Sequence, residues 1–242
     1  MDNYRAPSVW RDDLQRWLGA SAAVAAGGDA GFSDDGELPS VPSAAGTLDI
    51  APAGMTLKPA AVLILVVNRP VGPQVLFTQR TPHLTDHGGQ ISFPGGRVED
   101  DDRDPVHTAL RETFEETGVP MEQVETLGAL PDYITGTGYR INPIVGWIAS
   151  PVDYAPDPKE VAECFEVPLE FLLDTRNHKL ESAMYKGRMR SFYAVPYQHR
   201  YIWGATAGML VTLTRVIAHA RGENAEPPVR MSPDPALRPF RS

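Results

Sequence analysis

Arg111-Glu112-Thr113-Phe114-Glu115-Glu116-Thr117-Gly118 is the stretch that decides the fold of this chain, and it predicts the last two turns of a helix. The helix is expected over 105–117, with Asp104 as its N-cap, Pro105 as its first residue and Gly118 as its stop. At about 100° per residue, its apolar and small side chains share one face. That buried face comprises Val106, Ala109, Leu110, Thr113 and Thr117.

Three glutamates gather on another side of this predicted helix, because residues three and four apart are neighbours on a helix surface. Glu112, Glu115 and Glu116 lie near its C-terminal end, where the helix dipole disfavours negative charge. At an effective dielectric constant of about 20, two such charges about 4 Å apart repel by roughly 4 kcal/mol. A solvated glutamate face is the commoner explanation, but a divalent cation removes the repulsion. We therefore predict a Mg²⁺ or Mn²⁺ site, with Arg111 orienting the carboxylate of Glu115.

Composition and charge exclude several classes of partner. The 242 residues carry a formal net charge of −9, which argues against long nucleic acids as the ligand. The longest strongly apolar run, 60–67, is too short for a membrane span, and the N-terminus lacks the pattern of a secretory signal. A single cysteine, Cys164, permits no intramolecular disulfide and is expected to be a buried, inert thiol. We expect a cytoplasmic protein with no membrane partner, and a homodimer stays open.

The chain divides into three parts. Residues 1–56 are expected to form a short helix, over 7–18, followed by a flexible linker rich in Ala, Gly, Ser and Pro. Residues 57–221 are expected to form the folded domain, and 222–242 a disordered tail. Strands and helices do not alternate regularly, which favours the α+β class. Strands are predicted over 61–68, 74–79, 124–130, 142–149, 179–185 and 189–195, and further helices over 168–173 and 205–220.

The spacing of Gly96 and the glutamate helix resembles the Nudix box. That box runs Gly, five residues, Glu, seven residues, Arg-Glu-U-x-Glu-Glu-x-Gly-U, with U a bulky apolar residue. Here Asp102 stands in the Glu position, eight residues precede Arg111, and Thr113 replaces the first U. An alternative interpretation assigns Asp102 to a solvated acidic run, 99–102. The resemblance implies an α/β/α sandwich with a mixed β-sheet.

The segment before the box is similar to the signature of the coenzyme A pyrophosphatase branch of this family. Arg80, Gly89 and Phe93-Pro94-Gly95-Gly96 fall in register with it, whereas Thr85 stands where the branch has a second arginine. Segments 138–146, 160–163 and 203–207 are also similar, so the likeness covers about residues 60–218.

The resemblance implies metal-dependent hydrolysis of a pyrophosphate bond in a small nucleotide substrate. It assigns metal binding to Glu112 and Glu116, assisted by Glu115 and the backbone of Gly95 or Gly96. Catalytic roles are expected for Arg111 and Glu115, and the general base is expected outside the box, at Glu160 or Glu163, of which we favour Glu160. Substrate contacts are expected at Arg80, Gly89, Phe93, Gly95 and Arg140.

The branch identifies the substrate as coenzyme A or an acylated form of it. The products are then phosphopantetheine, or its acylated form, and adenosine 3′,5′-bisphosphate. Two alternatives remain: a Nudix hydrolase of ADP-ribose or dinucleoside polyphosphates, and a catalytically inactive nucleotide sensor of Nudix-like fold.

Overall fold

The computed structural model describes residues 7–26, 56–83, 88–185, 188–223 and 229–230. Most of the predicted linker, residues 186–187 between two predicted strands, and most of the predicted tail lie outside these residues. The helices are α1 (Pro7–Ala26), α2 (Pro105–Thr117), α3 (Leu169–Leu173) and α4 (Ala205–Ala220), with short 3-10 helices η1 (Met121–Gln123) and η2 (Thr175–Asn177).

The strands form two sheets. The larger contains β1 (Lys58–Arg69), β2 (Gly72–Arg80), β3 (Ile91–Ser92), β4 (Gly95–Arg97), β5 (Glu125–Ala129), β6 (Tyr133–Ile134), β7 (Tyr139–Ile148) and β8 (Val161–Pro168). The smaller contains β9 (Lys179–Tyr185), β10 (Arg188–Tyr197), β11 (Arg200–Trp203) and β12 (Val229–Arg230). In the larger sheet β1 and β7 are parallel and the other pairs antiparallel, so the sheet is mixed as predicted.

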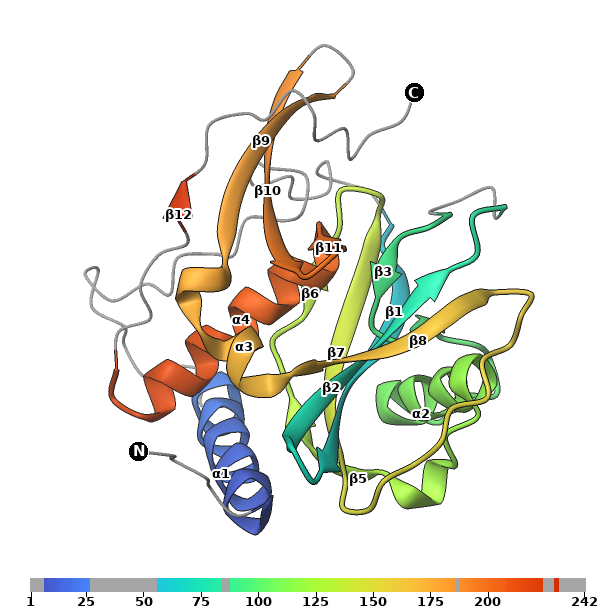
Figure 1. The fold of residues 1–242 in the computed structure, drawn as a ribbon, viewed down its shortest axis with the longest axis vertical. Helices are drawn as coiled ribbons and strands as arrows, with labels where there is room; N and C mark the ends of the chain where they lie inside the picture. Colours follow the sequence, from blue (N-terminus) through green and yellow to red (C-terminus); the bar gives the residue numbers. More distant parts are fainter. Residues whose placement is uncertain (1–6, 27–55, 84–87, 186–187, 224–228, 231–242) are drawn as a thin grey trace.

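Alternation along β1 produces the layers of the domain. Val62, Ile64 and Val66 belong to the core shared with α1 and α4. The intervening Ala61, Leu63, Leu65 and Val67 belong to a second core under α2. Because successive side chains of a strand point to opposite faces, one central strand supplies both cores. Figure 1 shows α2 on one side of this sheet and α1, α3 and α4 on the other, which confirms the α/β/α sandwich.

Helix α2 has the predicted bounds and caps. The Asp104 side chain accepts a 2.8 Å hydrogen bond from the backbone N–H of His107, and Pro105 is the first helical residue. Gly118 adopts a left-handed conformation, with φ 74°, and donates to the Phe114 carbonyl at 2.8 Å. A residue with a side chain is strained in this conformation, so glycine ends the helix here.

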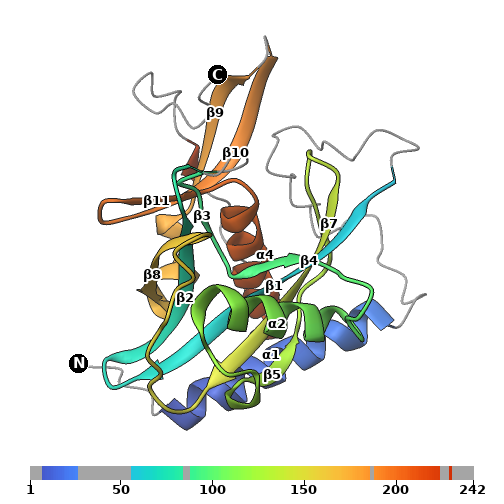
Figure 2. The same ribbon diagram turned by 90° about the vertical axis from the view of Figure 1, so that its right-hand side faces the viewer.

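The N-terminal helix is longer than predicted. Helix α1 includes residues 19–26, which the sequence assigned to the linker. Trp10, Leu14, Trp17 and Leu18 are buried in the core shared with α4. An ion pair between Arg11 and Glu125 joins α1 to β5. The helix is therefore packed onto the domain, and Figures 1 and 2 both place it beside β5.

Several strands escape prediction. Strand β8 pairs with β2, although Glu163 and Glu166 interrupt its apolar pattern; these glutamates fall between buried Val161, Phe165 and Val167. Strand β12 pairs in parallel with Lys179 and Leu180 of β9, inside the segment predicted as tail.

The hairpin β9–β10 projects away from the larger sheet in Figures 1 and 2. No helix among the described residues is both long and apolar enough to traverse a bilayer.

Candidate active site

The candidate site lies at the point along β1 where its antiparallel partner strand changes from β2 to β4. Residues 66–69 of β1 pair with β2, whereas 60–62 pair with β4. The C-terminal end of β2, the glycines of β4 and the glutamates of α2 are thereby brought together. The loop before β8 joins them, because Ala155 N–H donates to the Thr117 carbonyl at 2.8 Å and Thr81 N–H to the Glu160 carbonyl at 2.9 Å.

Arg111 organises the carboxylates at one side of the site. Its Nε and Nη2 atoms donate to the two oxygens of Asp102 at 2.9 and 2.8 Å. Its Nη1 atom donates to Glu112 at 3.0 Å and to Glu115 at 3.1 Å. The planar guanidinium group is well suited to donating two parallel hydrogen bonds to one carboxylate. The sequence predicted the contact with Glu115 but missed the stronger one with Asp102.

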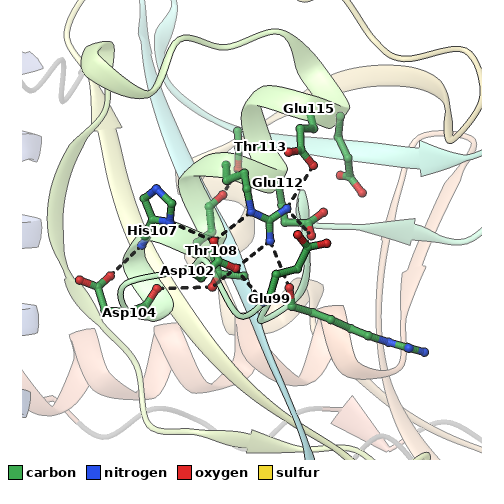
Figure 3. A network of polar contacts seen from close by, with 12 residues as sticks. Glu99, Asp102, Asp104, His107, Thr108, Glu112, Thr113 and Glu115 are labelled. Atoms are coloured by element: carbon green, nitrogen blue, oxygen red, sulfur yellow. Dashed lines mark hydrogen bonds and ion pairs between the residues drawn. The ribbon is translucent and has the colours of Figure 1, made fainter.

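Asp102 is the buried hub of this network, which Figure 3 shows in close view. Its side chain is 1% exposed and also accepts hydrogen bonds from Thr108, at 2.9 Å, and from the backbone N–H of Glu99, at 2.9 Å. The Arg111 guanidinium, above all, holds the pKa of Asp102 well below its usual range. The alternative interpretation of Asp102 as part of a solvated run is therefore wrong.

Glu112 lies directly against the backbone of β4. A Cβ atom at Gly96 would approach the Glu112 carboxylate to 2.4–2.5 Å, so any larger residue would displace the carboxylate from this position. Burial raises the pKa of Glu112, and its hydrogen bond with Arg111 opposes that rise. The geometry explains the glycine at position 96 and places a carboxylate beside the β4 main chain.

Glu116 does not share the environment of the other two glutamates. It is 5% exposed, and its Oε2 atom is buried with no hydrogen-bond partner within the described part of the chain. Burial raises the pKa of Glu116 to about 8, while the charge of Arg80, 3.7 Å away, and a backbone hydrogen bond from Gly95 oppose that rise. A buried oxygen without a partner is costly unless something binds it.

Glu160 and Glu163 are separated by the structure. Glu160 lies at the site, with its Oε2 atom 3.7 Å from Nη2 of Arg80, and it is 54% exposed. Glu163 forms two hydrogen bonds with Arg200, at 3.0 and 2.7 Å, and contributes no side chain to the site. Burial raises the pKa of the neighbouring Cys164 thiol to about 11, as expected of an inert cysteine.

The donor set fits a divalent cation of the magnesium type. Within the described ranges, no group of three or more His, Cys, Asp or Glu side chains is placed to hold a metal ion by itself. Mg²⁺, however, is commonly held by one or two carboxylates, with water and substrate phosphates supplying its remaining ligands. Glu112 beside the β4 backbone and Glu116 with its unpartnered oxygen match that requirement. Glu115 is 55% exposed and hydrogen-bonded to Arg111 at the margin of the site.

The predicted substrate contacts are distributed unevenly. Gly89 lies beside Arg80 in the β2–β3 connection, since its N–H donates to the Arg80 carbonyl at 3.1 Å, and it has a φ of 76°. Gly95 is packed so closely on β1 that a Cβ there would meet the Ala61 carbonyl at 2.4 Å. Thr85 lies outside the described residues.

One predicted substrate contact is corrected by the structure. Phe93 is 1% exposed and its ring stacks on Phe77 with centroids 5.0 Å apart, so it packs in the core and presents no ring to a ligand. Arg140 is exposed and ion-paired with Asp132, and its contact with substrate stays a prediction. Because successive side chains of a strand point to opposite faces of the sheet, Arg140 of β7 points to the face opposite Tyr139. The Tyr139 hydroxyl accepts hydrogen bonds from Arg97 at 3.0 and 2.6 Å.

Comparison with known proteins supports this description. Residues 57–186 match the family model described as NUDIX domain. The chain is similar to proteins named "Uncharacterized Nudix hydrolase NudL". One, from Klebsiella pneumoniae subsp. pneumoniae, is 41% identical over 154 residues, which are 63% of this chain and 79% of that protein. Another, from Pectobacterium atrosepticum, is 39% identical over 163 residues, 66% of this chain and 83% of that protein.

Solved structures of the same family resemble the chain more distantly. The Nudix hydrolase RenU from M. smegmatis is 23% identical, with a TM-score of 0.42 over 50% of this chain and 83% of that one. The Nudix domain of Shewanella oneidensis NrtR, complexed with ADP ribose, is 21% identical, with a TM-score of 0.39 over 48% and 76%. The family match and the identity to the relatives, together with the glutamate helix in its place, identify the chain as a member of the Nudix hydrolase family, whose enzymes act on pyrophosphate bonds.

Proposed function

We propose that this enzyme hydrolyses the pyrophosphate bond of coenzyme A or acyl-coenzyme A, releasing adenosine 3′,5′-bisphosphate and phosphopantetheine or its acylated form. The observation that carries the catalytic part is the buried, unpartnered Oε2 atom of Glu116, whose carboxylate lies with that of Glu160 around the guanidinium of Arg80 at the end of β2. The substrate is supported by the similarity of Arg80, Gly89 and 93–96 to the coenzyme A branch. The single cysteine suits a reducing cytoplasm.

In this proposal Glu112 and Glu116 would hold Mg²⁺ or Mn²⁺, and the carbonyl of Gly95 or Gly96 would complete the site. When bound there, such an ion would supply neutralisation of the diphosphate charge and polarisation of the phosphoryl group. Arg111 fixes the Glu112 carboxylate through its Nη1 hydrogen bond. Asp102 in turn anchors Arg111, so the orientation of Glu112 is set before substrate binds.

Glu160 is the proposed general base. It accepts a proton from the attacking water as the water oxygen bonds to phosphorus, and the bond between that phosphorus and the bridging oxygen breaks, so that the bridging oxygen leaves with the other phosphate. Its side chain is half exposed beside Glu116, so both water and substrate can reach it. The guanidinium of Arg80, on the same side of the sheet, is the proposed contact for a substrate phosphate.

A substitution of Glu160 by Gln is expected to lower kcat by about 10²-fold, the lower end of the contribution of a general base. Glu163→Gln is the matched control, because Glu163 is paired with Arg200 away from the site. The measurement is steady-state kcat of both variants at saturating substrate and metal. Equal activity in the two variants would remove Glu160 from the mechanism.

The substrate is tested by incubating the protein with Mg²⁺ or Mn²⁺ and a panel of pyrophosphates. The panel contains coenzyme A, acyl-coenzyme A, ADP-ribose, NADH and diadenosine polyphosphates, and products are separated by chromatography. We expect coenzyme A or its acyl form to give adenosine 3′,5′-bisphosphate at the highest kcat/KM. Turnover of ADP-ribose without coenzyme A would overturn the branch assignment and leave the family intact.

One observation favours an alternative substrate. Thr85 replaces an arginine of the coenzyme A signature, which removes a cation from a segment expected to meet a phosphate-rich ligand. A nucleoside diphosphate derivative with fewer phosphates, such as ADP-ribose, would not need that contact. The inactive sensor is the third candidate, and the complete set of Glu112, Glu115 and Glu116 argues against it. Failure to turn over any member of the panel would favour the sensor.

A further inference from the structure

Arg80 lies between two carboxylates of the site and hydrogen-bonds neither of them. Its Nη1 atom is 3.7 Å from Oε1 of Glu116, and its Nη2 atom is 3.7 Å from Oε2 of Glu160. Both distances exceed the range of 2.7–3.2 Å usual for N–H···O hydrogen bonds. The guanidinium thus compensates charge at Glu116 and Glu160 without being fixed in one geometry.

The backbone that carries Arg80 is held firmly. Its N–H donates to the Gln90 carbonyl at 2.9 Å, and its carbonyl accepts from Gly89 N–H at 3.1 Å. The register between β2 and β8 shifts between Gln79 and Arg80, and irregularities of this kind redirect a side chain relative to a regular strand. A fixed backbone and a loosely paired side chain allow the cation to change partner without movement of the strand.

The two arginines of the site divide its carboxylates between them. Arg111 hydrogen-bonds Asp102, Glu112 and Glu115, three of the acidic groups. In the described part of the chain, Arg80 is the cation ion-paired with Glu116 and Glu160. Glu116 is also the carboxylate with the unpartnered buried oxygen. A divalent ion bound to Glu116 would therefore enter the field of Arg80 and be repelled by it.

We propose that Arg80 is an internal counterion of the metal site, which competes with the divalent ion for Glu116 and is released toward the substrate phosphate when the ion binds. This inference rests on the metal site of the proposed function and adds a second role to Arg80. One cation then serves two anionic partners in turn. Metal binding frees Arg80, and a substrate phosphate that captures it prevents its return to Glu116, so metal and substrate favour each other's binding.

The test is the affinity for Mn²⁺ in the absence of substrate, measured by isothermal titration calorimetry and by the electron paramagnetic resonance signal of free Mn²⁺. Arg80→Ala is expected to bind Mn²⁺ about tenfold more tightly than the wild type, within the usual range of coupling between two ligands. It should nevertheless show a lower kcat/KM at saturating Mn²⁺, because the phosphate contact is lost. A merely structural role for Arg80 would not tighten metal binding.

Three variants support the comparison. Arg80→Gln removes the charge but keeps much of the side-chain length, and it should behave as Arg80→Ala does even if the latter is poorly folded. Arg80→Lys keeps the charge and should stay near the wild-type affinity. Arg97→Ala removes an exposed cation of β4 whose hydrogen bonds go to Tyr139, so its Mn²⁺ affinity should be unchanged.

Two failures are distinguishable. If the wild type binds Mn²⁺ and both uncharged Arg80 variants bind it equally or more weakly, the counterion role is overturned while the metal site stands. If the wild type shows no Mn²⁺ binding that Glu116→Gln removes, the metal site itself fails, and this inference fails with it.

Discussion

Replacement of Glu116 by Gln is expected to lower kcat by about 10³-fold, the scale of losing one preorganised electrostatic contact with the transition state. The variant removes a charge that the proposed metal needs and keeps the shape of the side chain. The buried Oε2 atom of Glu116 has no hydrogen-bond partner in the described part of the chain, so the substitution breaks no hydrogen bond at that atom. We therefore expect Gln at this position to fold with undiminished stability.

The measurement is steady-state turnover of the best substrate of the panel, with calorimetry of Mn²⁺ binding and a thermal melt of each protein. Glu122→Gln is the matched control, because Glu122 is an exposed glutamate of η1 with no assigned role at the site. It should retain wild-type activity. Full activity in Glu116→Gln would refute the assignment of Glu116 as a metal ligand.

Replacement of Asp102 by Asn is expected to destabilise the protein by about 3 kcal/mol, as when one partner of a buried ion pair is removed. The Asp102 side chain is 1% exposed, and its partner Arg111 is 17% exposed. The remaining contacts of Arg111 with Glu112 and Glu115 keep the loss at the lower end of the usual range. Denaturant unfolding of variant and wild type measures the difference.

The same variant should also lower kcat/KM by about 10- to 100-fold, because Asp102 orients Arg111, which in turn holds Glu112. Asp101→Asn is the matched control, since Asp101 is the exposed neighbour in the acidic run. Equal stability of the Asp101 and Asp102 variants would show that Asp102 is solvated after all.

A pH dependence follows from the direction of the Asp102 pKa. The folded state holds this pKa well below its usual range, so the carboxylate contributes stability above the unfolded pKa of about 3.9. That contribution is lost as pH falls toward the folded pKa. The difference in unfolding free energy between wild type and Asp102→Asn should therefore be constant near neutral pH and shrink below about pH 4.

Local signals predicted the elements that flank the site. The bounds of α2 follow from Asp104, Pro105 and Gly118, which act through hydrogen bonds and backbone conformations within a few residues. Strands β1 and β7 and helix α4 follow from apolar patterns that a single strand or helix displays by itself. Strand β8 was missed because its charged residues become compatible with a strand only beside β2.

The sequence by itself determined the family box, the capped glutamate helix and the need of that helix for compensating cations. Tertiary structure alone decided which glutamate is buried, because Glu116 loses solvent to elements that are distant along the chain. It alone separated Glu160 from Glu163, moved Phe93 into the core and made Asp102 the anchor of Arg111. Burial and ion pairing depend on segments brought together by folding, whereas caps and periodicity act between near neighbours along the chain.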